Sequence, residues 1–146
     1  KESVFSRIEA SYTSELDTVT AIGDGKEPRW SSGKDVPRWT SRPQLGKKQW
    51  VEGTFSKPRK VRSVGVYWMQ DQQDVKFPKE WSMEVRNGNT WKPFELYVTD
   101  RFDNRANQYN VVHPAAPLTC DAIRIHMTPN DNSALGILEV QVAFEE

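Results

Sequence analysis

The sequence has one cysteine, no net charge and no long hydrophobic run. Because Cys120 is the single cysteine among 146 residues, the chain can form no internal disulfide. The 20 basic residues balance the 20 acidic ones, which argues against a nucleic acid as partner, since nucleic acid binding needs a basic face. No stretch approaches the roughly 20 apolar residues that cross a bilayer. We therefore expect no nucleic acid partner and no membrane span.

Motifs of enzyme chemistry are also scarce. The two histidines, His113 and His126, are isolated in the sequence, and no HExxH, CxxC or phosphate-loop pattern occurs. Paired carboxylates can hydrolyse glycosides, but nothing in the sequence marks one pair of acidic residues above the others. We expect the domain to be non-catalytic.

Helix signals are weak, while short stretches with a period of two are frequent. Nine prolines and eight glycines interrupt the chain, and Asn87-Gly88 is a strong signal for a two-residue hairpin turn. The pattern predicts about eight strands in one all-β domain over residues 1–146, an antiparallel β-sandwich or jelly roll. The expected inward-facing sets are Trp81, Met83 and Val85; Ile123, Ile125 and Met127; Leu138, Val140, Val142 and Phe144. We also expect Trp50, Trp68, Trp81 and Trp91 to belong to the core.

The segment from Ala21 to Trp50 has no regular periodicity, but it holds three of the six tryptophans, three prolines and four glycines. Long loops in a compact β domain are usually functional. Trp30 and Trp39 can each serve as a lid over the core or as an exposed platform, and the sequence leaves both possibilities open.

Several short stretches resemble the discoidin-like family in their order and spacing. They are ASYT, AIGDGKEPRWSS, KKQWVEGTFSKPRKVRSVGVYW, FPKEW and GILEVQV. This family is the coagulation factor type C or galactose-binding-like jelly roll, which includes carbohydrate-binding module family 32. Within the family, the chain resembles more closely the discoidin-like domains appended to bacterial glycoside hydrolases. The resemblance implies a module of a larger protein that is secreted, periplasmic or at the bacterial cell surface, with a covalently linked catalytic domain.

The resemblance also implies a structural Ca²⁺ that fixes the N-terminal loop against the last strand. Ca²⁺ takes 6 to 8 oxygen ligands, many of them carbonyls of tight turns, and Asp24 and Glu139 match the family's side-chain ligands. The complete expected ligand set is Ala21, Asp24, Lys26, Ser31 and Glu139. Arg29 departs from the family, in which a hydroxyl side chain is common at this position. The alternative is that Asp24 caps a turn and Glu139 pairs with an arginine.

A sugar site requires an aromatic ring on a loop with planar polar groups beside it. We expect Trp39 or Trp30 to stack on the sugar, with the hydroxyls bound by polar side chains of the loops. The expected residues are Trp30, Arg38, Trp39, Asp71, Arg105 and Asn132. Arg42 fits the same description within this segment, but Arg38 and Arg42 can equally brace carboxylates within the loop. Ser41-Arg42 stands where relatives often carry aromatic residues.

The leading hypothesis is a carbohydrate-binding module that directs an attached glycoside hydrolase to a polysaccharide or glycan. The alternative is a structural accessory domain without a ligand, which packs its loops against a catalytic domain. These hypotheses differ in their expectation for Trp30 and Trp39, which would be a sugar platform in the first and a domain contact in the second.

Overall fold

The computed structural model describes residues 3–145 of the chain, which form strands connected by loops and one short 3₁₀ helix. The strands are β1 (Arg7–Ala10), β2 (Trp39–Thr40), β3 (Gln49–Trp68), β4 (Glu80–Asn87), β5 (Thr90–Pro93), β6 (Tyr109–Val112), β7 (Leu118–Thr128) and β8 (Gly136–Phe144). The 3₁₀ helix η1 covers Val19–Gly23. The expected all-β fold with eight antiparallel strands is confirmed.

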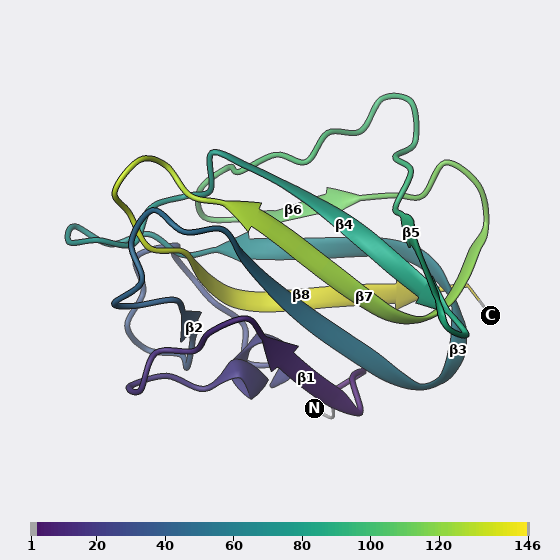
Figure 1. Ribbon diagram of the computed structural model, residues 1–146, viewed down its shortest axis with the longest axis horizontal. Coiled ribbons are helices and arrows are strands. Elements are labelled where there is room, and N and C mark those ends of the chain that lie inside the picture. The colour runs from purple at the N-terminus through teal and green to yellow at the C-terminus, as the bar shows by residue number, and fades with distance from the viewer. Residues whose placement is uncertain (1–2, 146) are drawn as a thin grey trace.

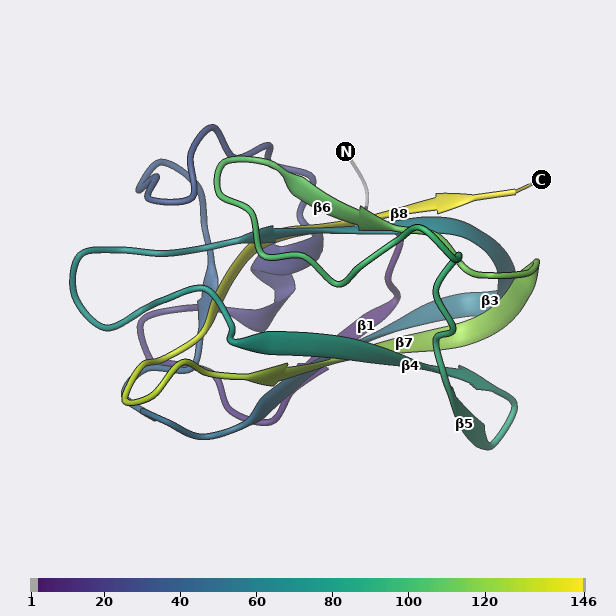
Figure 2. The same cartoon turned by 90° about the horizontal axis from the view of Figure 1, so that it is seen from above.

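The long strand β3 belongs to both layers of the sandwich. Its first half pairs with β1 and β7, and its second half pairs with β8 and β6. The register between β3 and β7 shifts between Thr54 and Arg59, where the strand bends from one layer into the other. One layer therefore contains β1, β3, β7, β4 and β5, and the other contains β2, β8, β3 and β6 (Figures 1 and 2).

The core fills the space between the two layers. As the alternation predicts, Met83, Val85, Ile123, Ile125 and Met127 are all buried in it. The prediction for the last strand is wrong at one residue. Tyr67 pairs with Glu139 but Trp68 pairs with Ile137, so a bulge inserts Leu138 and turns it into a second cluster with Tyr67, Met69 and Val75.

The tryptophans divide between the core and the outer surface. Trp68 and Trp81 are buried and pack edge to face with ring centroids 5.2 Å apart, which confirms their predicted place. The prediction is wrong for Trp50 and Trp91, which are only half-buried. Both lie on the outer face of the first layer, because their cross-strand partners His126 and Arg86 point away from the core.

Candidate functional site: the loop end of the sandwich

Loops from distant parts of the sequence meet at one end of the sandwich. The segment before β2, the β3–β4 loop and the β7–β8 loop all lie at the left of Figures 1 and 2. Backbone hydrogen bonds connect them. Ser41 N–H donates to Leu135 O at 2.9 Å, and Gln70 N–H donates to Ser31 O at 3.1 Å. These bonds make the loop end a defined surface.

A groove of about 860 Å³ opens at this end, and we call it the loop-end groove. Its lining residues are Ser14, Leu16, Asp17, Ser32, Lys34, Arg38, Arg42, Met69, Asp71, Gln72 and Gln73. Of the six residues predicted to bind sugar, the groove contains Arg38 and Asp71. Lys34 and Leu16 were missed, because a lone lysine and a lone leucine in a turn-rich segment carry no periodic signal.

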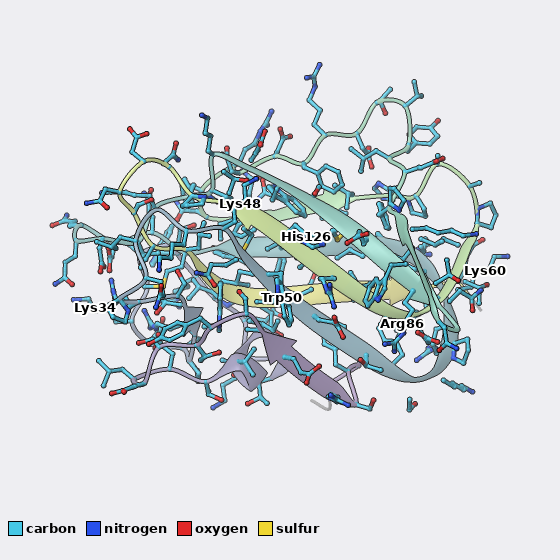
Figure 3. All side chains as sticks on the ribbon, in the orientation of Figure 1. Lys34, Lys48, Trp50, Lys60, Arg86 and His126 are labelled. Atoms are coloured by element: carbon cyan, nitrogen blue, oxygen red, sulfur yellow. The ribbon has the colours of Figure 1, made fainter. Side chains whose placement is uncertain are left out.

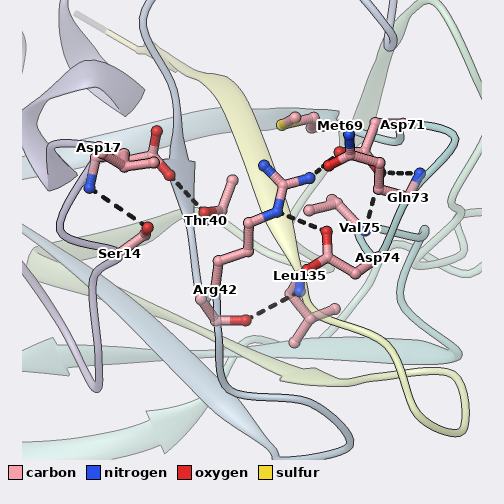
Figure 4. A network of polar contacts seen from close by, with 12 residues as sticks. Ser14, Asp17, Thr40, Arg42, Met69, Asp71, Gln73, Asp74, Val75 and Leu135 are labelled. Carbon is pink, nitrogen blue, oxygen red and sulfur yellow. Dashed lines mark hydrogen bonds and ion pairs between the residues drawn. The ribbon is translucent and has the colours of Figure 1, made fainter.

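Arg42 forms the centre of a polar network under the groove (Figure 4). Its Nε donates to Asp74 Oδ1 at 2.6 Å, and its second terminal nitrogen pairs with Asp71 Oδ2. The other Asp71 oxygen accepts the backbone N–H groups of Gln73 at 2.9 Å and Val75 at 3.0 Å. Arg42 therefore braces carboxylates, which was one of its two expected roles. Both oxygens of Asp71 are already bonded to the protein, so Asp71 shapes the β3–β4 loop.

Asp17 is held in a similar way on the other wall of the groove. Its carboxylate accepts the hydroxyl hydrogen of Thr40, and Ser14 accepts the N–H of Leu16 (Figure 4 shows Ser14, Asp17 and Thr40). This arrangement leaves the Leu16 side chain 92% exposed at the rim.

Arg38 has a different environment from Arg42. One terminal nitrogen donates to Val36 O at 2.8 Å, and the other lies 3.9 Å from the Met69 sulfur. Within residues 3–145 Arg38 has no ion pair, and Lys34 beside it is exposed. These two cations are therefore available as donors for a ligand, beside the amides of the exposed Gln72 and Gln73.

The structure corrects the prediction for Trp39. Its side chain is 0% exposed, it belongs to the main core cluster, and its indole N–H donates to Tyr12 O at 2.9 Å. A ring that is enclosed by protein cannot stack on a sugar. Trp39 is a core residue of β2 that closes the loop end of the sandwich from inside.

Trp30 is accessible, with 57% of its surface exposed. Its position is fixed by its neighbour, because Ser31 N–H donates to Asn107 Oδ1 and Asn107 N–H donates to Ser31 Oγ, both at 2.8 Å. This reciprocal pair joins the Trp30 segment to the loop that carries Arg105. Arg105 is exposed, and both Trp30 and Arg105 lie outside the groove lining.

Asn132 lies in a smaller hollow next to the groove, which it shares with Gln70, Lys76 and Phe77. The six residues predicted to bind sugar therefore do not line one common site. Arg38 and Asp71 share the groove, Trp30 and Arg105 lie on the joined loops, Asn132 lines the neighbouring hollow, and Trp39 is buried.

The expected cation site lies on the outer face of β8, where η1 and the following turn cover Glu139. This residue is 3% exposed, and its Oε2 accepts the N–H of Gly25 at 2.9 Å. Within residues 3–145 no donor reaches Oε1, which is also buried. Burial, and secondly the proximity of Asp24, raises the pKa of Glu139 to about 8, against the opposing effect of the Gly25 N–H.

These features fit a cation site. A buried carboxylate oxygen without a hydrogen-bond partner is unfavourable unless a bound cation or a proton neutralises it. Gly25 adopts a φ of 75°, which turns the chain between Asp24 and Lys26. Asp24 Oδ1 accepts the N–H of Lys26 at 2.9 Å, and Ala21 O accepts the N–H of Asp24 at 3.3 Å. Arg29 is exposed.

Two of the expected ligands, Ser31 and Lys26, fit the cation site less well than Asp24 and Glu139. The Ser31 hydroxyl is already bonded to Asn107, 76 residues away in the chain, and the Lys26 side chain is exposed, so only its carbonyl is a suitable ligand. Within the described part of the chain, no group of three or more His, Cys, Asp or Glu side chains is placed to hold a metal. The fit therefore rests on Glu139, Asp24 and backbone carbonyls.

The described residues include no helix long and apolar enough to cross a membrane. Cys120 is fully buried, and burial raises the pKa of its thiol to about 12.

Residues 7–140 match the model of the F5/8 type C domain family. Because this match covers most of the chain, the protein belongs to the F5/8 type C domain family, and the expected discoidin-like membership is confirmed. Among curated proteins, none matches the chain at a significant level.

Solved structures share the fold at low sequence identity. A chain of the Streptococcus pneumoniae β-galactosidase BgaA has a TM-score of 0.77 and 22% identity, with 95% of this chain and 91% of that chain covered. The family 32 carbohydrate-binding module of Clostridium perfringens NanJ, solved with galactose, has a TM-score of 0.71 and 14% identity over 93% and 91%. A chitosan-binding module from a chitosanase/glucanase of Paenibacillus sp. IK-5 has a TM-score of 0.70 and 16% identity over 97% and 96%.

Proposed function

We propose that this domain is a non-catalytic carbohydrate-binding module that holds a glycan at its loop end. The observation that carries the proposal is the loop-end groove, where Arg38 and Lys34 have no ion pair among the described residues. Trp30 does not line the groove, but it is 57% exposed and lies two residues before the lining residue Ser32. Guanidinium and ammonium groups donate to sugar hydroxyls, and an exposed indole stacks on the C–H face of a sugar ring. Sugar-binding relatives with the same fold support this assignment.

The acidic residues of the groove support binding without catalysis. Asp71 is bonded to Arg42 and to backbone N–H groups, and Asp17 is bonded to Thr40. Carboxylates that act as acid and base in glycoside hydrolysis have to reach the scissile bond. In this groove both carboxylates are used to hold the walls.

We further propose that Ca²⁺ binds between the Asp24 turn and Glu139. Glu139 Oε1 and the Asp24 carboxylate would supply the anionic oxygens, with the carbonyls of Ala21 and Lys26 as neutral ligands. The ion would provide positive charge that ties the turn to β8. It would order the segment leading to Trp30 and would take no part in sugar chemistry.

Structures with the same fold support a proposal about the setting of the module. The BgaA, NanJ and chitosanase/glucanase chains come from bacterial proteins, and two of these are named for enzymes that act on glycans. We propose that this module is likewise linked to a glycoside hydrolase outside the cytoplasm. Tethering raises the effective concentration of the enzyme at the polysaccharide, so a weak single site suffices.

One observation favours the alternative of a structural accessory domain. Leu16 and Trp30 are large apolar side chains that are mostly exposed at the loop end, 92% and 57% respectively. A catalytic domain packed on this end would bury both. In that case the isolated domain would bind no glycan, and joining the catalytic domain would protect Trp30 from solvent quenchers of its fluorescence.

Native affinity electrophoresis through gels that contain plant and animal polysaccharides tests the proposal. The wild-type domain should be retarded by at least one polysaccharide in the presence of Ca²⁺, and Arg38→Ala should weaken the retardation while the protein stays folded. Retardation of wild type and Arg38→Ala to the same extent would place binding elsewhere. Absence of retardation across the panel would favour the accessory domain.

A further inference from the structure

A second hollow lies on the outer face of the first layer, away from the loop-end groove. It has a volume of about 470 Å³, within the range of about 300–1,000 Å³ that is typical of ligand sites. We call it the sheet-face hollow. Its lining includes Lys48, which directly precedes β3, and five outward-facing side chains of three adjacent strands, Trp50, Glu80, Ser82, His126 and Thr128. The inward-facing Gln49, Trp81 and Met127 complete the lining. Figure 3 shows Lys48, Trp50 and His126 close together on this face.

Strand register explains why this surface is hollowed. Trp50, His126 and Ser82 are direct cross-strand partners on β3, β7 and β4, and Glu80 pairs with Thr128 in the next outward row. The small side chains of Ser82 and Thr128 therefore lie next to the larger Trp50, Glu80 and His126. Side chains that differ this much in size leave a depression on the pleated surface.

Trp50 is held in place from one side. The Arg124 guanidinium carbon lies 4.7 Å from the centre of the Trp50 ring and 4.6 Å from that of Trp91, and Arg86 lies 5.4 Å from the Trp91 ring. We call this stack of Trp50, Arg124, Trp91 and Arg86 the Trp–Arg ladder. Glu52 and Asp121 each accept from an arginine of the ladder at 2.8 Å, so both guanidinium groups are fixed.

The hollow borders Trp50 on the side of His126 and Ser82, whereas Arg124 is not among its lining residues. One part of the indole is therefore covered by the ladder and another part faces the hollow. A ring immobilised in this way loses little entropy when a ligand stacks on it. His126 is also ordered, because its Nε2 lies 2.6 Å from Glu84 Oε1.

The remaining groups define the kind of ligand. Ser82 and Thr128 offer hydroxyls, Lys48 offers an ammonium donor and Glu80 a carboxylate acceptor, so the formal charges of the last two cancel. A surface with a fixed aromatic ring, balanced charge and several hydroxyls matches a neutral sugar ring, which has one apolar C–H face and several hydroxyl groups.

We propose that the sheet-face hollow is a second carbohydrate-binding site, which takes one neutral pyranose unit of a glycan on Trp50. Its residues are distinct from those of the loop-end groove, so either site can exist without the other.

NMR titration of the ¹⁵N-labelled domain tests this site separately. The probes are galactose, glucose, mannose and neutral hexasaccharides of each. The background is the Trp30→Ala, Arg38→Ala double variant, which disables the proposed loop-end site. We expect at least one probe to shift the Trp50 indole N–H and the amides of Ser82 and Thr128 in a saturable way.

Two variants decide whether these shifts report binding in the hollow. Ser82→Arg fills the hollow from an exposed position and should weaken binding at least about tenfold, or about 1.4 kcal/mol. Tyr97→Ala removes an exposed aromatic side chain that belongs neither to the hollow lining nor to the ladder, and it should keep the affinity within about twofold. The proposal is overturned if no probe shifts Trp50 in the double variant, if Ser82→Arg binds as the double variant does, or if Tyr97→Ala abolishes binding.

If the wild type shows shifts at the loop end alone, the sheet-face site is wrong and the proposed function stands. If shifts appear at the hollow alone, the sheet-face site is supported and the loop-end assignment is wrong.

Discussion

The loop end and the outer sheet face each carry a tryptophan that is at least partly exposed, but they hold it by different means. At the loop end, Trp30 is positioned by the Ser31–Asn107 pair, and the groove wall depends on Arg42, Asp71 and Asp74. On the sheet face, Trp50 is positioned by strand register and by its stack on Arg124. Loop geometry therefore depends on a few polar contacts, whereas the sheet face follows from the fold itself. Removing one residue should have unequal effects in the two regions.

The largest effect is expected for Trp39→Ala, which tests whether the loop end is built on a buried tryptophan. The change removes a fully enclosed ring and a hydrogen bond to Tyr12. Urea denaturation should show that the free energy of unfolding falls by about 3–5 kcal/mol, the cost that is typical of replacing a buried tryptophan by alanine. If Trp39→Ala keeps wild-type stability and loses only sugar binding, Trp39 is a platform and its assignment to the core is incorrect.

Calcium should act on the loop end and leave the sheet face unchanged. If Ca²⁺ binds at Glu139, a free concentration of 100 times Kd stabilises the domain by about 2.7 kcal/mol. Differential scanning calorimetry should show a higher Tm with Ca²⁺ than with chelator in the wild type, and no difference in Glu139→Gln. An equal calcium shift in both proteins would place the ion elsewhere.

The pH dependence of stability, measured in the presence of a chelator, tests the role of Glu139 without calcium. The pKa of Glu139 is raised to about 8 from 4.5, so the folded protein keeps a proton that the unfolded chain loses within this window. The contribution of Glu139 to stability therefore falls as the pH rises from about 4.5 to about 8. Glu139→Gln should remove this part of the pH dependence, and urea titrations at several pH values measure it.

Arg42→Ala should lower the stability of the domain more than Lys34→Ala does. Loss of Arg42 leaves Asp71 and Asp74 without their cation. Because these carboxylates are partly exposed to water, we expect the free energy of unfolding to fall by only about 1–2 kcal/mol. Lys34→Ala should stay within about 0.5 kcal/mol. Urea unfolding gives both values, and equal values for the two variants would remove Arg42 from its bracing role.

The smallest effect is expected on the sheet face. Trp91→Ala removes the stacking on Arg124 and Arg86 but leaves the strand pairing intact. We therefore expect the free energy of unfolding, measured in urea, to fall by about 1 kcal/mol. A loss as large as that of Trp39→Ala would show that the ladder, and with it the outer face, is as essential to the fold as the core.

The sequence predicted the sheet better than the loops, and the reason is physical. Alternation with a period of two placed Met83, Val85, Ile123, Ile125 and Met127 correctly, because one face of each strand has to be buried. The prediction failed at Leu138, where a bulge shifts the register by one residue. It failed again at Trp50 and Trp91, since a large aromatic can be covered by an arginine on the outer face as well as by the core.

The candidate site was less predictable, because loop residues are placed by partners far away in the chain. Ser31 depends on Asn107, and Arg42 depends on Asp71 and Asp74, at separations that no local pattern shows. Trp30 and Trp39 looked equivalent in the sequence, although only Trp39 is inserted between the layers. The pairing of the Asp24 turn with Glu139 came from the family resemblance.

The most direct test of the account compares Trp30→Ala with Tyr97→Ala in affinity electrophoresis on a polysaccharide that retards the wild type. The two aromatics are similarly accessible, at 57% and 50%, and neither lines the groove, but Trp30 lies two residues before the lining residue Ser32, whereas Tyr97 lies in another loop. We predict that Trp30→Ala weakens retardation at least about tenfold and that Tyr97→Ala keeps it. Equal retardation of the two variants would contradict a loop-end carbohydrate site.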